Sequence, residues 1–236
     1  GKENPSPIDL HAHIVPGVDD GAKSFEESLK MLQIAGADGI EAIAATPHVF
    51  SIHNTLKDIG EIINQTREFL DRLNQYAINL QVFQGAEVFF TTRVMEYLKE
   101  YGKLLALNGG SYLLLELPFE MVFPGTQAFL FKILTEGWIP IIVHPERNTV
   151  IQRNPGILYD WIKTCVLIQV NAGSLKGIFG EEARETSFHL LRHNLVHVIA
   201  SDAHSQNRRA PELSFVYPVL ENEGIEGAPL LVSGNP

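Results

Sequence analysis

The chain has 236 residues, of which 45% are hydrophobic and 19% are charged, and it carries a net charge of −10. This acidity argues against nucleic acid as a partner, because binding to a phosphate backbone needs a surface rich in Lys and Arg. No apolar run approaches the roughly 20 residues of a membrane span. The single cysteine excludes an intrachain disulfide framework and a Cys-rich zinc cluster.

Short apolar runs alternate with helical patterns along the whole chain, which indicates parallel strands joined by helices. We expect one domain over residues 1–236, in which 1–7 are an N-terminal extension or a tag remnant. The predicted strands are 8–13, 41–45, 80–85, 112–117, 139–144, 166–170 and 196–201. The predicted helices, the first with a capping box of Ser24 and Glu27, are 24–38, 56–76, 92–101, 125–136, 155–164, 181–193 and 211–223.

Polar residues distinguish a closed barrel from an open doubly wound sheet. In an open sheet only the strands near the switch point share one site, whereas in a closed barrel all strand ends meet at one mouth. Here the polar residues fall at the C-terminal ends of the predicted strands throughout the chain: His11, His13, His48, Glu87, Glu116, His144, Asn171, Asp202 and His204. The sequence therefore favours an α/β barrel with its site at that mouth.

The first strand carries Asp9, His11 and His13. Residues two apart on a strand point to the same side, so the two imidazoles can bind one ion while Asp9 orients a ring from behind. Two histidines in ordinary core hydrogen bonds are the alternative. The acidic turn of Asp19 and Asp20 is either a solvated loop before a helix or a source of one ligand at the barrel mouth.

Further candidate ligands end the later strands. His48 follows a Thr-Pro pair, Glu87 is placed to bridge two cations, and His144 ends a β-branched run, while Asp202 and His204 repeat the two-apart spacing. Each alone could be an ordinary core or junction residue, but together they indicate a metal centre. Mixed imidazole and carboxylate ligands suit Mn²⁺, Fe²⁺ or Zn²⁺ better than Ca²⁺, and so many ligands indicate two or three ions.

Three arginines, Arg147, Arg208 and Arg209, follow candidate ligands closely, and guanidinium groups bind phosphate in a bidentate manner. The sequence leaves open which of Arg208 and Arg209 points at the site. The remaining histidines lack the spacing or the neighbouring Glu of a metal motif, and we place them outside the site: His53, His189, His193 and His197.

Cys165 is a poor candidate for the nucleophile of a cysteine phosphatase. That chemistry needs an arginine six positions after the thiolate, and position 171 is asparagine. We expect Cys165 to be a small core residue at the start of a strand. A lone cysteine fits a reducing compartment, and we expect a cytoplasmic protein.

Seven segments carry a resemblance to a known family: IDLHAH, PGVDDGAK, ATPH, GAE, VHPER, QVNAGS and SDAH. Together they resemble the PHP (polymerase and histidinol phosphatase) superfamily, and within it the bacterial manganese-dependent protein-tyrosine phosphatases of capsule and exopolysaccharide synthesis. The similarity runs from residue 8 to about 223, and PGVDDGAK is its most specific part. The chain departs from many relatives after His48, where residues 49–52 replace a second His or an Asn-rich loop.

The resemblance implies a distorted (β/α)7 TIM-like barrel of the PHP type with Mn²⁺, in which Fe²⁺ or Zn²⁺ could replace it. The implied metal ligands are His11, His13, Asp20, His48, Glu87, His144, Asp202 and His204. Arg147 and Arg209 are the implied phosphate-binding residues. We expect Asp9, Asn171 and Arg208 behind the ligands or at the substrate rim.

The resemblance also implies the reaction, in which a metal-bridged hydroxide attacks a phosphotyrosine in the tail of a bacterial tyrosine autokinase. Two alternatives stay open. One is a small-molecule phosphatase, for example for histidinol phosphate. The other is a barrel without catalytic activity that binds the kinase tail.

Overall fold

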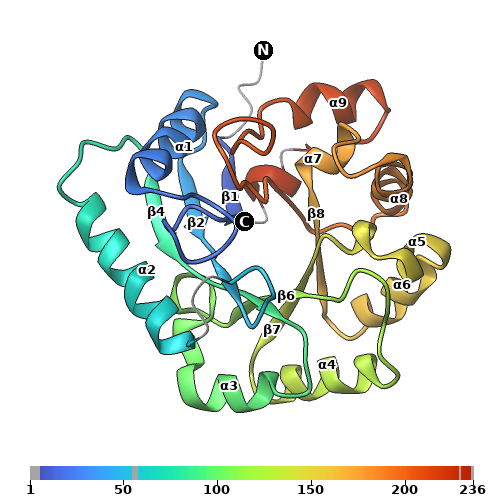
Figure 1. The fold of residues 1–236 in the computed structure, drawn as a ribbon. Coiled ribbons are helices and arrows are strands. Elements are labelled where there is room, and N and C mark those ends of the chain that lie inside the picture. The colour runs from blue at the N-terminus through green and yellow to red at the C-terminus, as the bar shows by residue number, and fades with distance from the viewer. Residues whose placement is uncertain (1–5, 55–57, 229, 235–236) are drawn as a thin grey trace.

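The computed structural model describes residues 6–54, 58–228 and 230–234. Within them, helices form an outer ring around short strands (Figure 1). The strands are β1 (Ile8–Ala12), β2 (Ala42–Ala45), β3 (His48–Val49), β4 (Gln81–Gln84), β5 (Glu87–Phe89), β6 (Tyr112–Glu116), β7 (Ile139–Val143), β8 (Leu167–Asn171) and β9 (Val198–Ala200). The α-helices are α1 (Phe25–Ala37), α2 (Ile59–Leu73), α3 (Val94–Tyr101), α4 (Thr126–Thr135), α5 (Thr149–Arg153), α6 (Gly156–Ile162), α7 (Ala172–Leu175), α8 (Glu181–Arg192) and α9 (Val216–Asn222). The shorter helical turns are η1 (Gly102–Leu104), η2 (Leu107–Gly109), η3 (Pro145–Arg147) and η4 (Leu230–Gly234).

The strands pair in parallel to form a closed barrel. One sheet has the order β1-β2-β4 and the other the order β3-β5-β6-β7-β8-β9. β3 continues β2, and β5 continues β4, after a break of residues 46–47 and 85–86. The chain after β9 returns to β1, where His13 N donates to Ala203 O and Asp202 N donates to His11 O, each at 2.8 Å. The predicted distorted barrel is confirmed, and the interrupted strands are its distortion.

The breaks in the two strands have local causes. Pro47 lacks a backbone N–H and cannot continue the ladder of β2, and its carbonyl accepts from Glu87 N at 3.0 Å. Gly85 lies so close to Leu107 that a Cβ would stand 2.8 Å from Leu107 Cδ2. After the breaks, His48 and Glu87 stand opposite each other in β3 and β5. The breaks therefore bring these two side chains to the barrel mouth.

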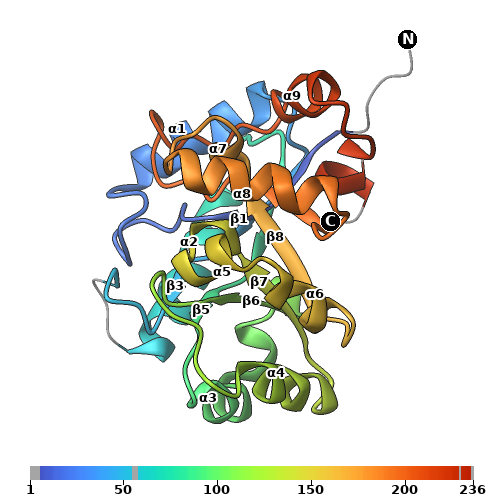
Figure 2. The ribbon, with the colours of Figure 1, turned by 90° about the vertical axis from the view of Figure 1, so that its right-hand side faces the viewer.

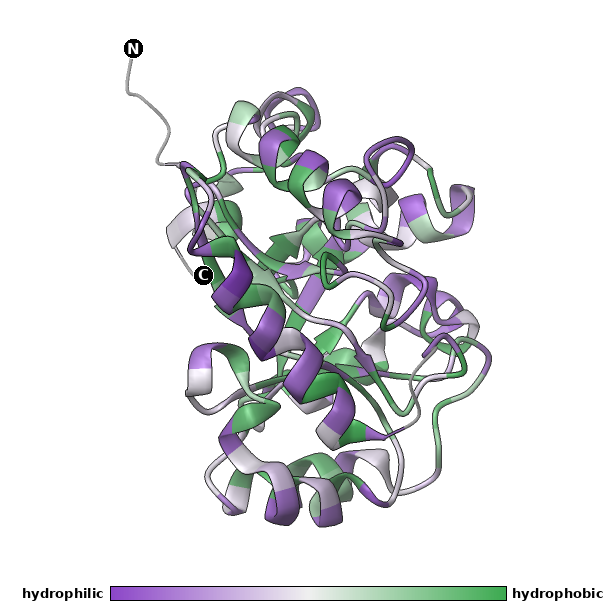
Figure 3. Cartoon of the chain, turned by 60° about the vertical axis from the view of Figure 1, so that its left-hand side comes forward, coloured by the Kyte–Doolittle hydropathy of each residue, from purple (hydrophilic) through white to green (hydrophobic). Residues whose placement is uncertain are grey.

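The two ends of the barrel differ. In Figure 2 the loop after β1 lies on the left, at the C-terminal end of the strands, whereas the described end of the chain lies on the right. Along the outer helices, hydrophilic and hydrophobic residues alternate (Figure 3), as expected for helices with one face on a core. No helix in the described part of the chain is long and apolar enough to cross a membrane.

Most predicted elements exist, with some differences at their ends. Ser24 caps α1 by accepting from Glu27 N at 3.2 Å, as the capping box predicts. The four residues of α7 and the five of α5 are too short to show a helical period, and both were missed. The last predicted helix starts only at Val216, not at residue 211. Residues 1–5 and 55–57, within the predicted extension and the start of the predicted second helix, lie outside the described residues.

The prediction for Cys165 is wrong. Its side chain is exposed, and its backbone has a φ of 72°. This left-handed conformation belongs to the turn between α6 and β8, and the strand itself begins only at Leu167. An apolar run that follows a tight turn does not bury the turn residue.

We predict that Gly21→Ala destabilises the fold by about 1 to 3 kcal/mol, since overpacking at a fixed backbone has that cost. A Cβ on Gly21 would lie 2.2 Å from His13 O and 2.5 Å from His13 Cβ. Gly36→Ala is the matched control, because its Cβ would meet only Leu80 Cδ2 at 3.6 Å inside α1, where alanine favours the helix. In thermal unfolding, the melting temperature should be highest for Gly36→Ala, lower for wild type and lowest for Gly21→Ala. An unchanged melting temperature for Gly21→Ala would contradict this packing.

Candidate metal centre

Among the described residues, nine side chains with metal-binding atoms meet at the C-terminal mouth of the barrel. They form four overlapping groups, and within each group one ligand atom per residue lies within 4.8 Å of the others. The groups are His13, Asp20, His48 and His204; His11, Glu87 and His144; His11, His13 and Asp202; and His48, Glu87 and Glu116. The structure thus brings together all eight predicted ligands. It adds Glu116, which the sequence analysis noted at a strand end but left out of the ligand set.

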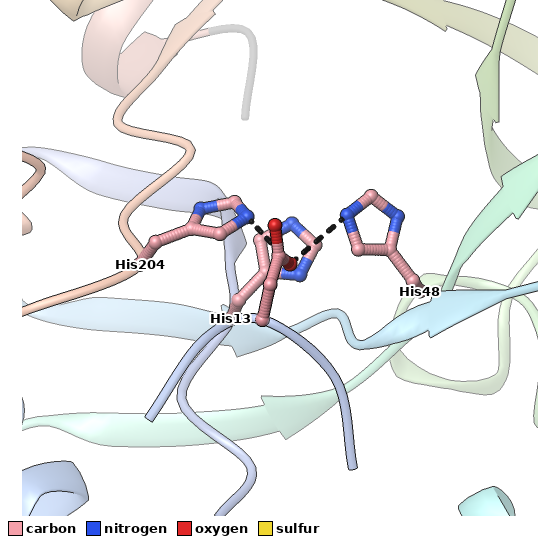
Figure 4. A group of neighbouring side chains, drawn as sticks. His13, His48 and His204 are labelled. Carbon is pink, nitrogen blue, oxygen red and sulfur yellow. Dashed lines mark ion pairs between the residues drawn. The ribbon is translucent and has the colours of Figure 1, made fainter. Parts of the chain in front are cut away.

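The outermost group lies close to solvent. His204 Nε2 lies 3.2 Å and His48 Nε2 lies 3.5 Å from Asp20 Oδ1, and the Asp20 side chain is 39% exposed. The ring of His13 lies between them, with its centroid 3.9 Å from that of His204 and 4.4 Å from that of His48 (Figure 4). Three imidazoles and one carboxylate therefore converge at a point that a substrate can reach.

Glu87 occupies the centre of the deeper groups. Its Oε2 lies 3.1 Å from His13 Nε2, 3.0 Å from His48 Nδ1 and 3.3 Å from His11 Nε2. Its other oxygen, Oε1, lies 2.9 Å from His144 Nε2. The two oxygens face different sets of imidazoles, which is the arrangement a bridging carboxylate needs.

The two carboxylate oxygens of Asp202 face different side chains, one the histidines and the other the arginines. Its Oδ1 lies 3.3 Å from His13 Nε2. Its Oδ2 accepts from Arg209 Nη2 at 2.7 Å and from Asn171 Nδ2 at 2.6 Å, and Arg147 Nη1 lies 3.4 Å away. Asp202 therefore joins the cluster of candidate ligands to the two arginines that the resemblance implies for phosphate.

Two side chains behind the cluster orient the first histidine pair. Gln169 Oε1 lies 2.7 Å from His11 Nδ1, and Asp19 Oδ2 lies 2.9 Å from His13 Nδ1. A partner on Nδ1 leaves the Nε2 of each ring facing the centre. Asp19 is thus engaged behind His13, while Asp20, the aspartate that the resemblance implies as a ligand, faces the cluster. Gln169 was missed, and its only sequence signal is a polar residue within an apolar strand.

The predicted supporting residues have different surroundings. Asp9 does not orient a ring as expected, because its carboxylate accepts from Ser201 N at 3.0 Å and from the Ser201 hydroxyl. Asn171 binds Asp202, as a residue behind the ligands would. Arg208 Nη2 donates to Ile178 O at 3.1 Å, so Arg209 is the member of the arginine pair that faces Asp202.

The histidines left out of the predicted site fall in three places. His53 lies at the edge of the cluster, with its Nδ1 3.6 Å from Asp20 Oδ2 and its ring 5.3 Å from that of His48. This proximity was missed, because a loop without periodicity joins the two histidines. His189 and His193 pair with each other at the exposed end of α8. His197 Nδ1 accepts from Ile168 N at 3.0 Å, away from the cluster.

Burial and charge oppose each other in the cluster. Burial raises the pKa of Glu87, but the imidazoles of His11 and His48 outweigh it and hold this pKa well below its usual range. Burial lowers the pKa of His13, but Asp19 and other carboxylates outweigh it and hold this pKa well above its usual range. Burial and the charge of Glu87 raise the pKa of Glu116 to about 10. The pKa of His11 is raised as well, because Glu87 and Asp202 outweigh its burial, so protons on His11, His13 and Glu116 balance part of the buried negative charge when no other cation does.

The residues present fit a group of divalent cations. Among the described residues, six buried side-chain atoms lack a hydrogen bond, and four of them belong to the cluster: Asp20 Oδ1, His48 Nδ1, Glu87 Oε2 and Asp202 Oδ1. Such buried polar atoms are costly unless something else satisfies them. Two candidate ligands, His144 with a φ of 35° and Asp202 with a φ of 51°, also hold strained backbone conformations of the kind found at functional sites.

Comparison with known proteins agrees with this geometry. The sequence model of the family "Capsular polysaccharide synthesis, CpsB/CapC" matches residues 7–228. The chain is 36% identical over 235 residues to the tyrosine-protein phosphatase YwqE of Bacillus subtilis, covering 97% of this chain and 89% of that protein. It is 31% identical over 237 residues to the tyrosine-protein phosphatase CpsB of Streptococcus pneumoniae, covering 97% and 96%.

Solved structures show the same relationship. A crystal structure from a study of YwqE and S. pneumoniae CpsB, described as unique metal-dependent tyrosine phosphatases, matches with a TM-score of 0.87 and 34% identity over 97% of this chain and 92% of that chain. An amidohydrolase from Mycoplasma synoviae shares the fold alone, with a TM-score of 0.59 and 13% identity over 99% and 87%. The match over residues 7–228 and the identity to the two phosphatases show that the chain belongs to the CpsB/CapC family of capsular polysaccharide synthesis.

Proposed function

We propose that this chain is a metal-dependent protein-tyrosine phosphatase. The observation that carries the proposal is the position of Asp202, whose carboxylate faces three imidazoles with one oxygen and two guanidinium groups with the other. Metal ligands directly beside paired arginines combine a place for ions that activate water with groups that stabilise charge on a transferred phosphoryl group. The membership of the family supports the same activity.

The ions of the proposed centre are held by the eight predicted ligands together with Glu116. Four carboxylates among them balance the charge of two divalent ions, and the overlapping groups favour two or three ions. We propose Mn²⁺, with Fe²⁺ or Zn²⁺ able to replace it, because the ligands mix imidazole and carboxylate. When bound, such ions activate water and neutralise charge on the phosphoryl oxygens.

The side chains around the centre then have separate roles. Arg147 and Arg209 are 20% and 24% exposed, so their guanidinium groups can exchange Asp202 for the oxygens of an entering phosphoryl group. Asn171 Nδ2 keeps a hydrogen bond on Asp202 Oδ2 during that exchange. A tyrosyl group leaves as a phenolate with a pKa of about 10, so its departure needs little protonation.

The shape of the mouth favours a protein substrate over a small molecule. The outermost group of ligands is open to solvent at Asp20. The cavity of about 1090 Å³ in this barrel lies at its other end, lined by residues near the strand N-termini such as Ile8, Ala42 and Gln81. A phosphotyrosine in an extended tail can reach an open mouth, and we propose the tail of a bacterial tyrosine autokinase in the cytoplasm.

We predict that the purified chain hydrolyses a phosphotyrosine peptide with Mn²⁺ and loses this activity when a chelator removes the metal. Arg209→Met should lower kcat/KM by about 100-fold, the size expected for one group that stabilises transition-state charge. Cys165→Ser is the control and should keep wild-type activity. Steady-state kinetics on the peptide and on histidinol phosphate at equal concentration test this.

Three results of that experiment would contradict the proposal. A preference for histidinol phosphate would favour the small-molecule phosphatase. Metal-loaded protein that binds the peptide without releasing phosphate would favour a non-catalytic module. A large loss of activity in Cys165→Ser would exclude the metal mechanism.

We also predict that Glu116→Gln has opposite effects with and without metal. The pKa of Glu116 is about 10 in the folded chain and 4.5 by its ordinary value. Between these values the unfolded chain loses a proton that the folded chain keeps, so the free energy of unfolding falls as pH rises. Gln cannot ionise, so metal-free Glu116→Gln should gain stability over metal-free wild type as pH rises from 6 to 9. With Mn²⁺ the wild type should be the more stable protein, because it keeps a ligand.

Denaturant unfolding at both pH values, with chelator and with Mn²⁺, measures these differences. Glu120→Gln is the control, since Glu120 is exposed on the loop after β6. A stability difference that is the same at both pH values and in both metal states would show that Glu116 neither resists ionisation nor binds the ion.

A further inference from the structure

Arg147 lies between two aromatic rings. Its guanidinium carbon stands 4.5 Å from the centre of the Phe119 ring and 4.2 Å from that of Phe179. The guanidinium carbon of Arg209 stands 5.2 Å from the same Phe179 ring. One phenylalanine therefore contacts both arginines that face Asp202, and a second phenylalanine covers the other side of Arg147.

The segment that carries Phe179 is held in place by its own contacts. It forms a tight turn between α7 and α8, in which Gly177 and Gly180 have φ values of 73° and 98°. Arg208 Nη2 donates to Ile178 O at 3.1 Å. Arg208 thus contributes to the site without facing it. It fixes the turn that carries Phe179, and the Phe179 ring packs on Arg209.

Phe119 is fixed in a similar way on the opposite side. Asn148 Nδ2 donates to Pro118 O at 2.6 Å and to Met121 O at 2.9 Å, which holds the loop after β6. The Phe119 ring also stacks on His144, with centroids 5.8 Å apart and an interplanar angle of 30°. Both rings are partly exposed, so the core of the protein does not depend on either of them.

We propose that Phe119 and Phe179 are positioning residues that hold the guanidinium groups of Arg147 and Arg209 in the orientation that binds an oxyanion. An arginine side chain has several rotatable bonds, and fixing it before the anion arrives lowers the entropic cost of binding. An aromatic face attracts a guanidinium group and restrains its plane. This inference rests on the proposed function only for the assignment of the two arginines to phosphate.

The test is the affinity of Mn²⁺-loaded protein for inorganic phosphate, measured by calorimetry, with the metal content of each variant measured by elemental analysis. Phe179→Leu keeps an apolar side chain without an aromatic face, and we expect phosphate to bind about tenfold more weakly at unchanged metal content. Phe179→Tyr should bind as wild type. Arg208→Lys keeps the charge but loses the planar donor, and should weaken phosphate binding about threefold.

Tyr159→Leu is the matched control, because that exposed ring on α6 lies under Lys163, with its centre 4.2 Å from Nζ, rather than on either arginine. It should leave phosphate affinity unchanged. Equal affinity in wild type, Phe179→Leu and Arg208→Lys would overturn the inference, as would an equal loss in Phe179→Leu and Phe179→Tyr. If Phe179→Leu does not fold, Phe119→Leu and Arg208→Lys carry the same test.

Activity on a phosphotyrosine peptide separates this inference from the proposed function. In Phe179→Leu we expect kcat/KM to fall in parallel with phosphate affinity, with recovery in Phe179→Tyr. The phosphate affinities of wild type and variants could follow the predicted order while the wild type releases no phosphate from the peptide. That result would contradict the proposed function alone.

Discussion

The concentration of carboxylates at the barrel mouth is the constraint on which the rest of the site depends. Asp202, Glu87 and Glu116 are almost completely buried, and Asp20 stands beside them at the surface. Like charges in such a space repel each other strongly unless cations lie between them. Five imidazoles surround the carboxylates, but burial lowers the pKa of His144 and of His204 to about 4, so these two rings carry no compensating proton at neutral pH. Metal ions between the carboxylates would balance this charge and would satisfy the ligand atoms that lack a hydrogen bond.

The closure of the barrel and the assembly of this site are the same structural event. The hydrogen bond from Asp202 N to His11 O joins the segment after the last strand, β9, to the first strand, β1. The side chain of Asp202 then faces both the histidines and the arginines. The strained backbone of Asp202 and of His144 lies where each strand ends, so the strands deliver the ligands at the cost of unfavourable φ values. A barrel that failed to close would lose its metal centre as well.

Local patterns in the sequence predicted the strands and the candidate ligands. An apolar run that ends abruptly in His, Asp or Glu indicates a strand that enters a polar mouth, and this pattern alone located His144 and Asp202. The two breaks were not predicted: Pro47 marks the end of β2 in the sequence, but that the strand resumes as β3 depends on its pairing with β5, and the break at Gly85 depends on packing against Leu107. The exposed position of Cys165 was missed for a related reason, since a left-handed turn leaves little trace in residue type.

The residues that support the site were harder to predict than the ligands. Gln169 and Phe179 act through tertiary contacts, and the residues they contact are distant in the sequence. The position of Arg208 shows the same difficulty, because two adjacent arginines are equivalent in sequence, and only the turn at Ile178 distinguishes them. Ligand types follow from chemistry at a strand end, whereas supporting contacts follow from the geometry of the closed barrel.

Diffraction from crystals grown with Mn²⁺, measured at the manganese absorption edge, tests the central claim most directly. We expect two or three anomalous peaks at the barrel mouth, with Glu87 shared between two of them and Asp202 bound through Oδ1. Manganese bound elsewhere, in crystals of protein that hydrolyses phosphotyrosine, would contradict the account.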